Sequence, residues 1–214
     1  MTAPVLRVAL TGGIATGKSY CLTRFRALGA ATIDADVLAR EAVRPGSEGL
    51  AAVVARFGAS VLDGHGALDR AALARIVFAD AGARRDLESI IHPFVRAAIA
   101  AWTDRLRGDA HSRASSDPIL AIADIPLLYE QDRARDFDRV IVAACDPVLQ
   151  RQRLMMRNGL SADEADRRIA VQLPIAEKRR RADYVIDTSA SLGETDRQVD
   201  VVWRSLRAPS APVE

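Results

Sequence analysis

Gly12-Gly13-Ile14-Ala15-Thr16-Gly17-Lys18-Ser19 matches the phosphate-binding motif G-x-x-x-x-G-K-S/T at every specified position. An apolar run at residues 5–11 precedes it and is typical of a buried parallel strand. Downstream, apolar residues recur at helical spacing at Cys21, Leu22, Phe25 and Leu28. A strand, a glycine-rich loop and a helix N-terminus in this order bring backbone N–H groups and the helix dipole to one anion-binding hollow. An ordinary glycine-rich turn before a helix is the alternative.

The motif predicts which residues surround a bound nucleotide. Lys18 would reach the β- and γ-phosphates, and the Ser19 hydroxyl would ligate Mg²⁺. Lysine usage points the same way, because only Lys18 and Lys178 are lysines among 30 Lys plus Arg. A compact ammonium on a slim stem suits a phosphate cradle. The expected nucleotide-binding set is Gly13, Ile14, Ala15, Thr16, Gly17, Lys18, Ser19 and Tyr20.

Length and composition indicate one α/β domain with insertions, since 214 residues can bury one sizeable core. Aromatic residues make up only 5% of the chain, which argues against a stacking platform for single-stranded nucleic acid. The net charge of +2 is too small to indicate a duplex-binding surface, so we expect no nucleic-acid partner. Cys21 and Cys145 lie in apolar runs without a C-x-x-C partner, and we expect buried free thiols.

No apolar segment reaches the ~18 residues that a membrane span needs. The first apolar run leads directly into the phosphate loop and does not have the pattern of a signal peptide. We therefore expect a cytoplasmic protein with no membrane partner.

Further apolar runs predict four more strands, at residues 30–33, 119–125, 139–145 and 183–187. The first of these leads into Asp34 and Asp36, and the second contains Asp124. Because ligands gather at the carboxyl ends of strands in open parallel sheets, these acids are expected beside the phosphates. Asp34 has an alternative role as a helix cap, so Asp36 is the better functional candidate. Asp124 occupies the place of a Walker B carboxylate that would support Mg²⁺.

Residues 47–107 have mostly helical spacing, with Ser47 and Asp69 as expected N-caps. The longest apolar stripe is interrupted at His92-Pro93, where proline is expected to kink or restart the helix. Such a kink would turn the His92 imidazole toward whatever the bend faces. A purely structural histidine is the alternative.

Residues 147–181 contain nine Lys plus Arg and four acids, a net charge of +5. Asp146-Pro147 opens a helix with Arg153 and Arg157 on one face, and Gly159 ends it. Ser161 and Glu164 form a capping box for the next helix. A solvated basic face is one interpretation. After a phosphate loop, we favour a lid that brings guanidinium groups over the transferring phosphoryl group.

These patterns predict an α/β fold, a three-layer P-loop NTPase sandwich with a parallel five-stranded sheet, a helical acceptor-binding insertion and a helical lid. The single domain, residues 1–214, would have its core at about 5–46, 118–146 and 182–207, its insertion at about 47–117 and its lid at about 147–181. A polar linker is expected at residues 108–118 and a disordered tail at 208–214.

Three classes of phosphate-loop protein compete for this pattern. A guanine-nucleotide switch would need an Asn-Lys-x-Asp base reader, but Asn158 is the only asparagine and no lysine follows it. A transport or motor ATPase would be expected to carry a Gln-rich signature or further domains, which this sequence does not show. The class that remains is a small kinase with a nucleotide core, an acceptor-binding insertion and a lid.

Within that class the sequence resembles the dephospho-CoA kinase family from about residue 5 to residue 206. The segments that carry the resemblance are Leu10-Thr11-Gly12-Gly13-Ile14 with the loop, Ile33-Asp34-Ala35-Asp36 with Ala39-Arg40, Ile91-His92-Pro93, Ile125-Pro126-Leu127-Leu128-Tyr129-Glu130, Arg153 with Arg157, Arg168-Ile169 with Gln172, and Ala182-Asp183-Tyr184-Val185-Ile186-Asp187. The resemblance implies transfer of the ATP γ-phosphoryl group to the ribose 3′-hydroxyl of dephospho-CoA, the last step of coenzyme A synthesis, with ATP and Mg²⁺ as cofactors.

The resemblance also implies residue roles. Asp36 would be the general base, His92 part of the acceptor-binding region, and Arg157 a lid residue. The expected sets are catalytic Asp36, Lys18 and Arg157, substrate-binding Thr11, Asp36, His92 and Arg153, and metal-binding Ser19 and Asp124. We expect a monomer or a weak homo-oligomer. The alternative is a kinase of a nucleoside monophosphate or a small hydroxy acid, and less so a nucleotide-binding switch that is not a kinase.

The sequence departs from the family pattern at three positions. Thr188 stands where the family usually has Asn, which leaves the contacts on the adenine side open. Ala15 and Tyr20 replace commoner neighbours in the loop. Neither of these two changes a specified position of the motif.

Overall fold

The computed structural model describes residues 4–110 and 117–208. Its strands are β1 (Val5–Gly12), β2 (Ala31–Asp34), β3 (Ile119–Asp124), β4 (Arg139–Ala144) and β5 (Tyr184–Asp187). Its α-helices are α1 (Lys18–Ala27), α2 (Ala35–Ala42), α3 (Glu48–Phe57), α4 (Arg70–Ala79), α5 (Ala81–Ala110), α6 (Pro147–Asn158), α7 (Ala162–Ala170), α8 (Ile175–Arg180) and α9 (Leu192–Arg207). Short 3₁₀ turns occur at Ala59–Val61 and Ala134–Asp136. The chain divides into two compact units, one formed by residues up to 33 and from 105 onward, the other by residues 34–104.

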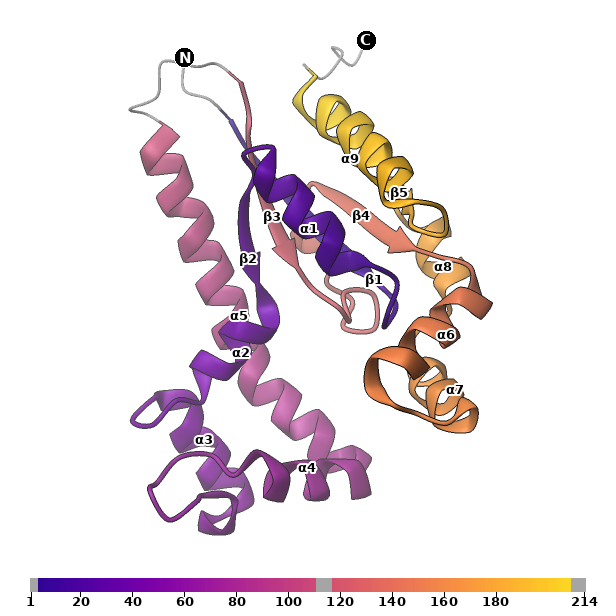
Figure 1. Ribbon diagram of the computed structural model, residues 1–214. Helices are drawn as coiled ribbons and strands as arrows, with labels where there is room; N and C mark the ends of the chain where they lie inside the picture. Colours follow the sequence, from indigo (N-terminus) through magenta and orange to yellow (C-terminus); the bar gives the residue numbers. More distant parts are fainter. Residues whose placement is uncertain (1–3, 111–116, 209–214) are drawn as a thin grey trace. The chain divides into compact units, whose positions relative to one another are not determined.

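The first unit is built on a five-stranded sheet with the order β2-β3-β1-β4-β5 (Figure 1). The central strand β1 pairs in parallel with β3, where Leu10 lies opposite Asp124. On its other side β1 pairs in parallel with β4, where Gly12 lies opposite Ala143. The phosphate loop therefore begins at the carboxyl end of β1, and Asp124 lies at the carboxyl end of the neighbouring strand β3. β4 pairs in parallel with β5 in turn.

Helices cover both faces of this sheet. Side chains alternate along a strand, so Val8 and Leu10 point to one face and Val5 to the other. The first face is covered by α1 and α9, which lie side by side (Figure 1). Its buried side chains are Val8, Leu10, Cys21, Leu22, Phe25, Ala30, Leu120, Ile122, Ile141, Ala143, Ile186, Val199, Val202 and Leu206. On the other face Leu106 packs against Val5 and Ile119. The predicted three-layer α/β fold is confirmed.

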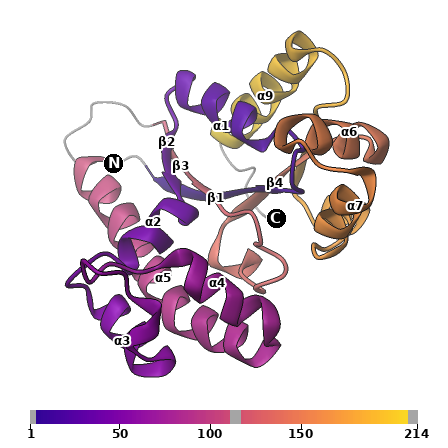
Figure 2. The ribbon, with the colours of Figure 1, turned by 60° about the horizontal axis from the view of Figure 1, so that its bottom comes forward.

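The second unit is a helical cluster of α2, α3, α4 and most of α5 (Figure 2). Its core contains Val43, Val53, Val61 and Leu73. This unit begins at residue 34, whereas the sequence suggested an insertion that begins near 47. The difference has a physical cause, because Val43 directly after α2 is only 3% exposed in this core and α2 contacts α3.

The long helix α5 continues through Pro93 and does not restart there. Proline removes one backbone hydrogen bond from a helix. Here the flanking residues Ile90 and Ile91 pack against the core of the second unit, so tertiary packing holds the helix together. The helix also extends into the predicted linker, and residues 111–116 of that linker and 209–214 of the predicted tail lie outside the described residues. No helix in the described ranges is both long and apolar enough to cross a membrane.

Helix ends lie where the local sequence signals place them. The side chains of the predicted N-caps accept backbone N–H hydrogen bonds of the first turn at Asp34, Ser47, Asp69, Asp146 and Ser161. Ser161 and Glu164 complete the predicted capping box. Gly159 follows α6 with a left-handed φ of 63°, as expected for a glycine that ends a helix.

Candidate active site

The predicted phosphate loop forms the turn between β1 and α1. Gly12 leaves no room for a side chain, because a Cβ atom there would lie 2.5 Å from the carbonyl oxygen of Ala143. Gly17 has a φ of 81°, a left-handed backbone that glycine adopts without steric cost. The backbone N–H and the hydroxyl of Thr16 both donate to the Gly13 carbonyl oxygen, at 3.3 and 2.8 Å. The loop is therefore closed by its own short-range hydrogen bonds.

The start of α1 is suited to an anion. The N-cap residue Gly17 has no side chain that could accept a hydrogen bond from the first turn. No acidic residue lies in the first turn of this described helix either. The N–H groups at the helix start therefore retain the partial positive charge of the helix dipole. The Tyr20 hydroxyl donates to Asp196 of α9 at 2.8 Å, so the side chain of this predicted nucleotide-binding residue is engaged with α9.

Lys18 and Asp124 form an ion pair at the carboxyl end of the sheet. The two side chains are 14% and 6% exposed, so the pair is largely withdrawn from water. Removing either partner would leave the other charge buried and unpaired, which is costly. The lysine of the motif and the predicted Walker B carboxylate are thus brought together at one place.

The donor set at this end fits a magnesium ion held chiefly by substrate phosphates. The described residues contain no group of three or more His, Cys, Asp or Glu side chains that could hold a metal by themselves. Mg²⁺ in phosphoryl-transfer sites is bound by one or two protein oxygens together with phosphates and water. Ser19 and Asp124 provide oxygens of the required kind.

Thr11 is completely buried, and its hydroxyl donates to the Pro126 carbonyl oxygen at 3.2 Å. From the sequence we expect Thr11 to bind substrate. In the structure its side chain links β1 to the segment that follows β3.

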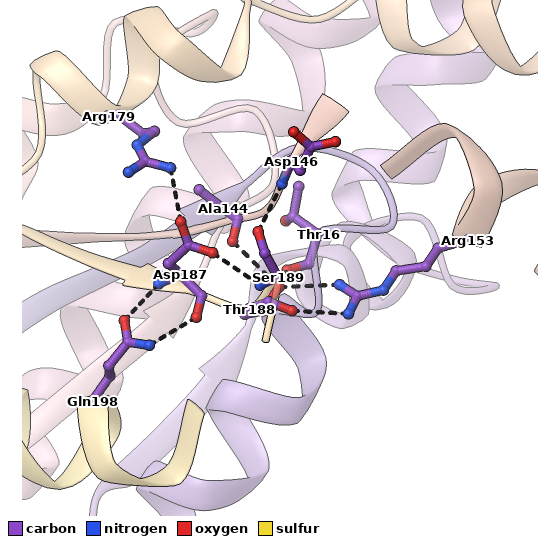
Figure 3. Close-up of polar contacts among 9 residues, drawn as sticks. All are labelled: Thr16, Ala144, Asp146, Arg153, Arg179, Asp187, Thr188, Ser189 and Gln198. Atoms are coloured by element: carbon purple, nitrogen blue, oxygen red, sulfur yellow. Dashed lines mark hydrogen bonds and ion pairs between the residues drawn. The ribbon is translucent and has the colours of Figure 1, made fainter. Parts of the chain in front are cut away.

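Arg153 on α6 contacts Thr188 immediately after β5 (Figure 3). Its Nη1 donates to the Thr188 hydroxyl oxygen at 3.1 Å, and its Nη2 donates to the Thr188 carbonyl oxygen at 2.8 Å. The Thr188 hydroxyl lies 2.8 Å from the carbonyl oxygen of Thr16, to which it donates. Arg153 therefore reaches the phosphate loop through Thr188. The sequence alone indicates no such contact for Thr188, although the departure from the usual Asn marks this position.

Asp187 and Ser189, the neighbours of Thr188, are tied down as well (Figure 3). Asp187 accepts from Arg179 at 3.1 Å and from the backbone N–H of Ser189 at 2.9 Å. Partial burial alone would raise the pKa of Asp187, but hydrogen bonds from Ser189 and Arg179 outweigh it and lower that pKa. Gln198 of α9 bonds both the N–H and the carbonyl oxygen of Asp187. Residues 187–189 are therefore held by several hydrogen bonds at the place where Thr188 contacts the phosphate loop.

The predicted lid consists of α6, α7 and α8. Arg157 is exposed in the last turn of α6, and its Nε donates to the side-chain oxygen of Asn158 at 2.9 Å. Arg151 pairs with Asp166 of α7 at 3.0 Å and links the first two helices. Lys178 of α8 differs from the exposed cations, because it is 0% exposed and pairs with Glu130 at 2.8 Å. A count of charges along the sequence could not show this burial.

In the second unit, Asp34 and Asp36 have different roles. The Asp34 carboxylate accepts from the backbone N–H groups of Asp36 and Val37 and caps α2, the alternative raised from the sequence. The Asp36 side chain is exposed and lines a groove of about 380 Å³. The other residues that line this groove are Ala39, Arg40, Val43, Leu68, Arg70, Leu73, Ala74, Val77, Phe78, Leu87 and Ile91. The lining of the groove combines apolar side chains with a carboxylate and two guanidinium groups.

His92 is half-buried on α5, next to Ile91, which lines the groove. Phe78 also lines the groove and is 88% exposed, so it presents a large apolar surface there.

Among the described residues, both cysteines are buried free thiols, as predicted. Burial raises the pKa of Cys21 to about 12, so this thiol is not a nucleophile at neutral pH.

Comparison with known proteins gives one consistent relationship. The family model described as dephospho-CoA kinase matches residues 6–194. A dephospho-CoA kinase of Anaeromyxobacter dehalogenans is 47% identical over 211 residues, which cover 96% of this chain and 97% of that protein. A dephospho-CoA kinase of Symbiobacterium thermophilum is 43% identical, covering 92% of this chain and 80% of that protein.

Solved structures agree with the sequence relatives. The structure of TT1252 from Thermus thermophilus has a TM-score of 0.74 at 30% identity and covers 96% of this chain and 100% of that chain. The dephospho-CoA kinase structure from Campylobacter jejuni has a TM-score of 0.68 at 28% identity, with coverage of 94% and 96%. Because the family model and the relatives extend over both the phosphate loop and the helical unit, this chain belongs to the dephospho-CoA kinase family.

Proposed function

We propose that this protein transfers the γ-phosphoryl group of ATP to the ribose 3′-hydroxyl of dephospho-CoA and so completes coenzyme A. The observation that carries this proposal is the phosphate loop, with Lys18 paired to Asp124, in a chain that matches the dephospho-CoA kinase family model from residue 6 to residue 194. Because the reaction consumes ATP, we propose the cytoplasm as its setting.

The first unit would hold ATP. Backbone N–H groups of the loop and the start of α1 supply fixed donors for the phosphates, and Lys18 supplies a cation. Ser19 and Asp124 would hold Mg²⁺, which when bound neutralises charge on the phosphate oxygens. Donors that are already in place require no reorganisation during the reaction. Such preorganised positioning and electrostatic stabilisation are the main source of catalysis in phosphoryl transfer.

The groove of the second unit would hold dephospho-CoA. Its apolar lining residues, which include Leu73, Val77 and Phe78, suit a long and partly apolar pantetheine arm. Arg40 and Arg70 at the same groove suit the diphosphate, since guanidinium groups bind phosphate oxygens in a bidentate way. A nucleoside monophosphate or a small hydroxy acid would leave these apolar side chains uncovered. His92 would contribute to this acceptor-binding region.

Asp36 is our proposed general base for the acceptor hydroxyl. Its carboxylate is exposed, it lines the groove, and the capping task of the helix start is carried by Asp34. A positioned carboxylate that removes the hydroxyl proton contributes a factor of about 10²–10⁴. Arg157 on α6 would stabilise charge on the transferring phosphoryl group when the lid closes.

A side-by-side acceptor panel tests the proposal. ATP consumption is measured with Mg²⁺ and equal concentrations of dephospho-CoA, adenosine, AMP and small hydroxy acids. We expect dephospho-CoA to turn over fastest and the phosphate to appear on its 3′-oxygen by NMR. Faster turnover of a nucleoside monophosphate or a hydroxy acid would decide for the rival class of kinase.

A further inference from the structure

The phosphate loop contains one residue in a strained conformation. Ala15 has a φ of 61°, in the left-handed region where a Cβ atom meets steric conflict. Such conformations persist only where the surrounding structure imposes them, and they collect at functional sites. The two bonds from Thr16 to the Gly13 carbonyl oxygen close the turn that contains Ala15, and hydrogen bonds from outside the loop add to them on both sides of Ala15.

Two glutamines hold the peptide groups of Ile14, immediately before Ala15. The Nε2 of Gln150 on α6 donates to the Ile14 carbonyl oxygen at 2.8 Å. The Oε1 of Gln172, which follows α7, accepts from the Ile14 N–H at 2.8 Å. Gln150 is 3% exposed and lies so close that a Cβ atom on Gly13 would be 2.6 Å from its Nε2. Both bonds link residues more than 130 positions apart in the chain.

Thr188 holds the other side of Ala15 (Figure 3). Its hydroxyl donates to the Thr16 carbonyl oxygen at 2.8 Å, and the residue is 5% exposed. Arg153 binds Thr188 through two hydrogen bonds and fixes its orientation. A Cβ atom on Gly17 would lie 3.1 Å from the same hydroxyl, so Thr188 packs closely behind the loop.

The backbone next to Gln172 is held in place by an ion-paired carboxylate. The backbone N–H of the next residue, Leu173, donates to Glu130 at 2.9 Å. Glu130 pairs with the fully buried Lys178 at 2.8 Å. The backbone at Gln172, just after α7, is therefore fixed, and the Gln172 side chain is held where it can bond Ile14.

We propose that Gln150, Gln172 and Thr188 are positioning residues that hold the strained phosphate loop in its ATP-binding shape. All three lie outside the motif, and all bind backbone atoms of the residues on either side of Ala15. A loop whose donors are fixed in advance binds its ligand without an ordering cost. Because this inference rests on the ATP site of the proposed function, its test uses nucleotide binding without an acceptor.

The test compares ADP·Mg²⁺ affinity by calorimetry in variants that remove one hydrogen bond each. Gln150→Met, Gln172→Met and Thr188→Val should weaken binding by roughly three- to tenfold, the effect of one lost hydrogen bond. Thr188→Ser keeps the hydroxyl and should bind ADP as the unaltered protein does. Gln152→Met, an exposed glutamine on the same helix, is the matched control and should change nothing. With ATP as substrate, KM should rise more than kcat falls.

The decisive readout is the same set of substitutions in an Ala15→Gly background. Glycine adopts a φ of 61° without steric cost, so the part of each loss that comes from the steric conflict of Ala15 disappears. We expect each loss of affinity to be smaller in this background. Equal losses in both backgrounds, or normal ADP binding by all three single variants, would overturn the inference. If buried Gln150→Met does not fold, the Thr188 pair and Gln172→Met carry the test.

The two proposals fail in different ways. A protein that binds ADP but does not phosphorylate dephospho-CoA contradicts the proposed function and leaves the loop inference standing. Variants that bind ADP normally contradict the inference and leave the proposed function standing.

Discussion

Lys178 forms an ion pair with Glu130, with 2.8 Å between the lysine nitrogen and the carboxylate oxygen, and the lysine side chain is 0% exposed. Lys178 also donates to the Pro126 carbonyl oxygen at 3.3 Å, which in turn accepts from the Thr11 hydroxyl. The pair therefore connects α8 to the segment after β3 and to the central strand.

The first prediction concerns this pair. Glu130→Gln should lower the free energy of unfolding by about 3 kcal/mol, because the ammonium of Lys178, which is 0% exposed, is left without its carboxylate partner. Lys178→Met with Glu130→Gln should recover part of that loss. Urea unfolding measures both. Arg180→Met is the control, since Arg180 pairs with Glu177 while 76% exposed and should contribute little. A single variant as stable as the unaltered protein would contradict a structural role for the pair.

Lys18→Ala should abolish phosphoryl transfer, with a loss in kcat of at least about 10²–10³, the range for one preorganised donor. The structure adds that it should also destabilise the protein, because Asp124 is 5% exposed and loses its cation. Lys18→Ala with Asp124→Asn should restore thermal stability and leave the enzyme inactive. This double variant separates catalysis from folding. Near-normal turnover in Lys18→Ala would remove the loop as the active centre.

Asp36→Asn should lower kcat by roughly 10²–10⁴ while ADP affinity stays the same, because the change removes basicity and keeps shape. Asp34→Asn is the matched control, since Asp34 caps α2 and asparagine caps a helix as well as aspartate does. If Asp36→Asn lowers only the melting temperature, Asp36 has no part in proton removal.

Arg157→Lys should reduce kcat, because lysine lacks the planar fork that binds two phosphate oxygens. Arg151→Lys is the comparison, as Arg151 pairs with Asp166 on the surface of α6 and α7. Similar losses at both positions, measured at saturating ATP, would indicate a general basic surface.

The last prediction concerns pH. The folded-state pKa of Asp187 lies below its ordinary value of 3.8, so the carboxylate contributes stability that is present above pH 3.8 and disappears as the pH falls through the folded-state pKa. Asp187→Asn should therefore lower the melting temperature at pH 6, and the difference from the unaltered protein should narrow below pH 3.8. Scanning calorimetry at pH 6, 4 and 3 measures this. A difference that stays constant over this range would show that the charge of Asp187 is not involved.

Local sequence signals predicted a large part of this fold. The N-caps Ser47, Asp69 and Ser161 act through residues two or three positions away, so a short window contains the whole interaction. The phosphate loop is local in the same sense, as Thr16 bonds Gly13 within it. Apolar runs located the five strands of the described sheet. The physical reason is clearest for β3 and β4, in which nearly every residue is buried, so apolar side chains are needed throughout.

Long-range contacts are what the sequence did not reveal. Arg153 is predicted from the sequence to bind substrate, and the structure adds that both of its terminal nitrogens bond Thr188, 35 positions away. Nothing in the sequence indicates that Gln150 contacts the phosphate loop, since a lone glutamine on a polar helix is usually solvated. Lys178 belonged to a basic run that resembled one exposed face, and only the packed structure shows it buried. The start of the second unit at residue 34 depends on where Val43 packs, which α2 alone does not specify.

Gly12 joins two roles that protein engineering usually tries to separate. It is the last residue of β1, paired with Ala143, and also the first residue of the phosphate loop. A methyl group at this position would lie 2.5 Å from a backbone oxygen of β4, so even alanine would force the sheet ladder apart where the nucleotide donors begin. A substitution at Gly12 is therefore unfavourable whether variants are selected for higher thermostability or for new acceptors, because any side chain here displaces the β4 backbone. A library that leaves Gly12 fixed loses no viable diversity.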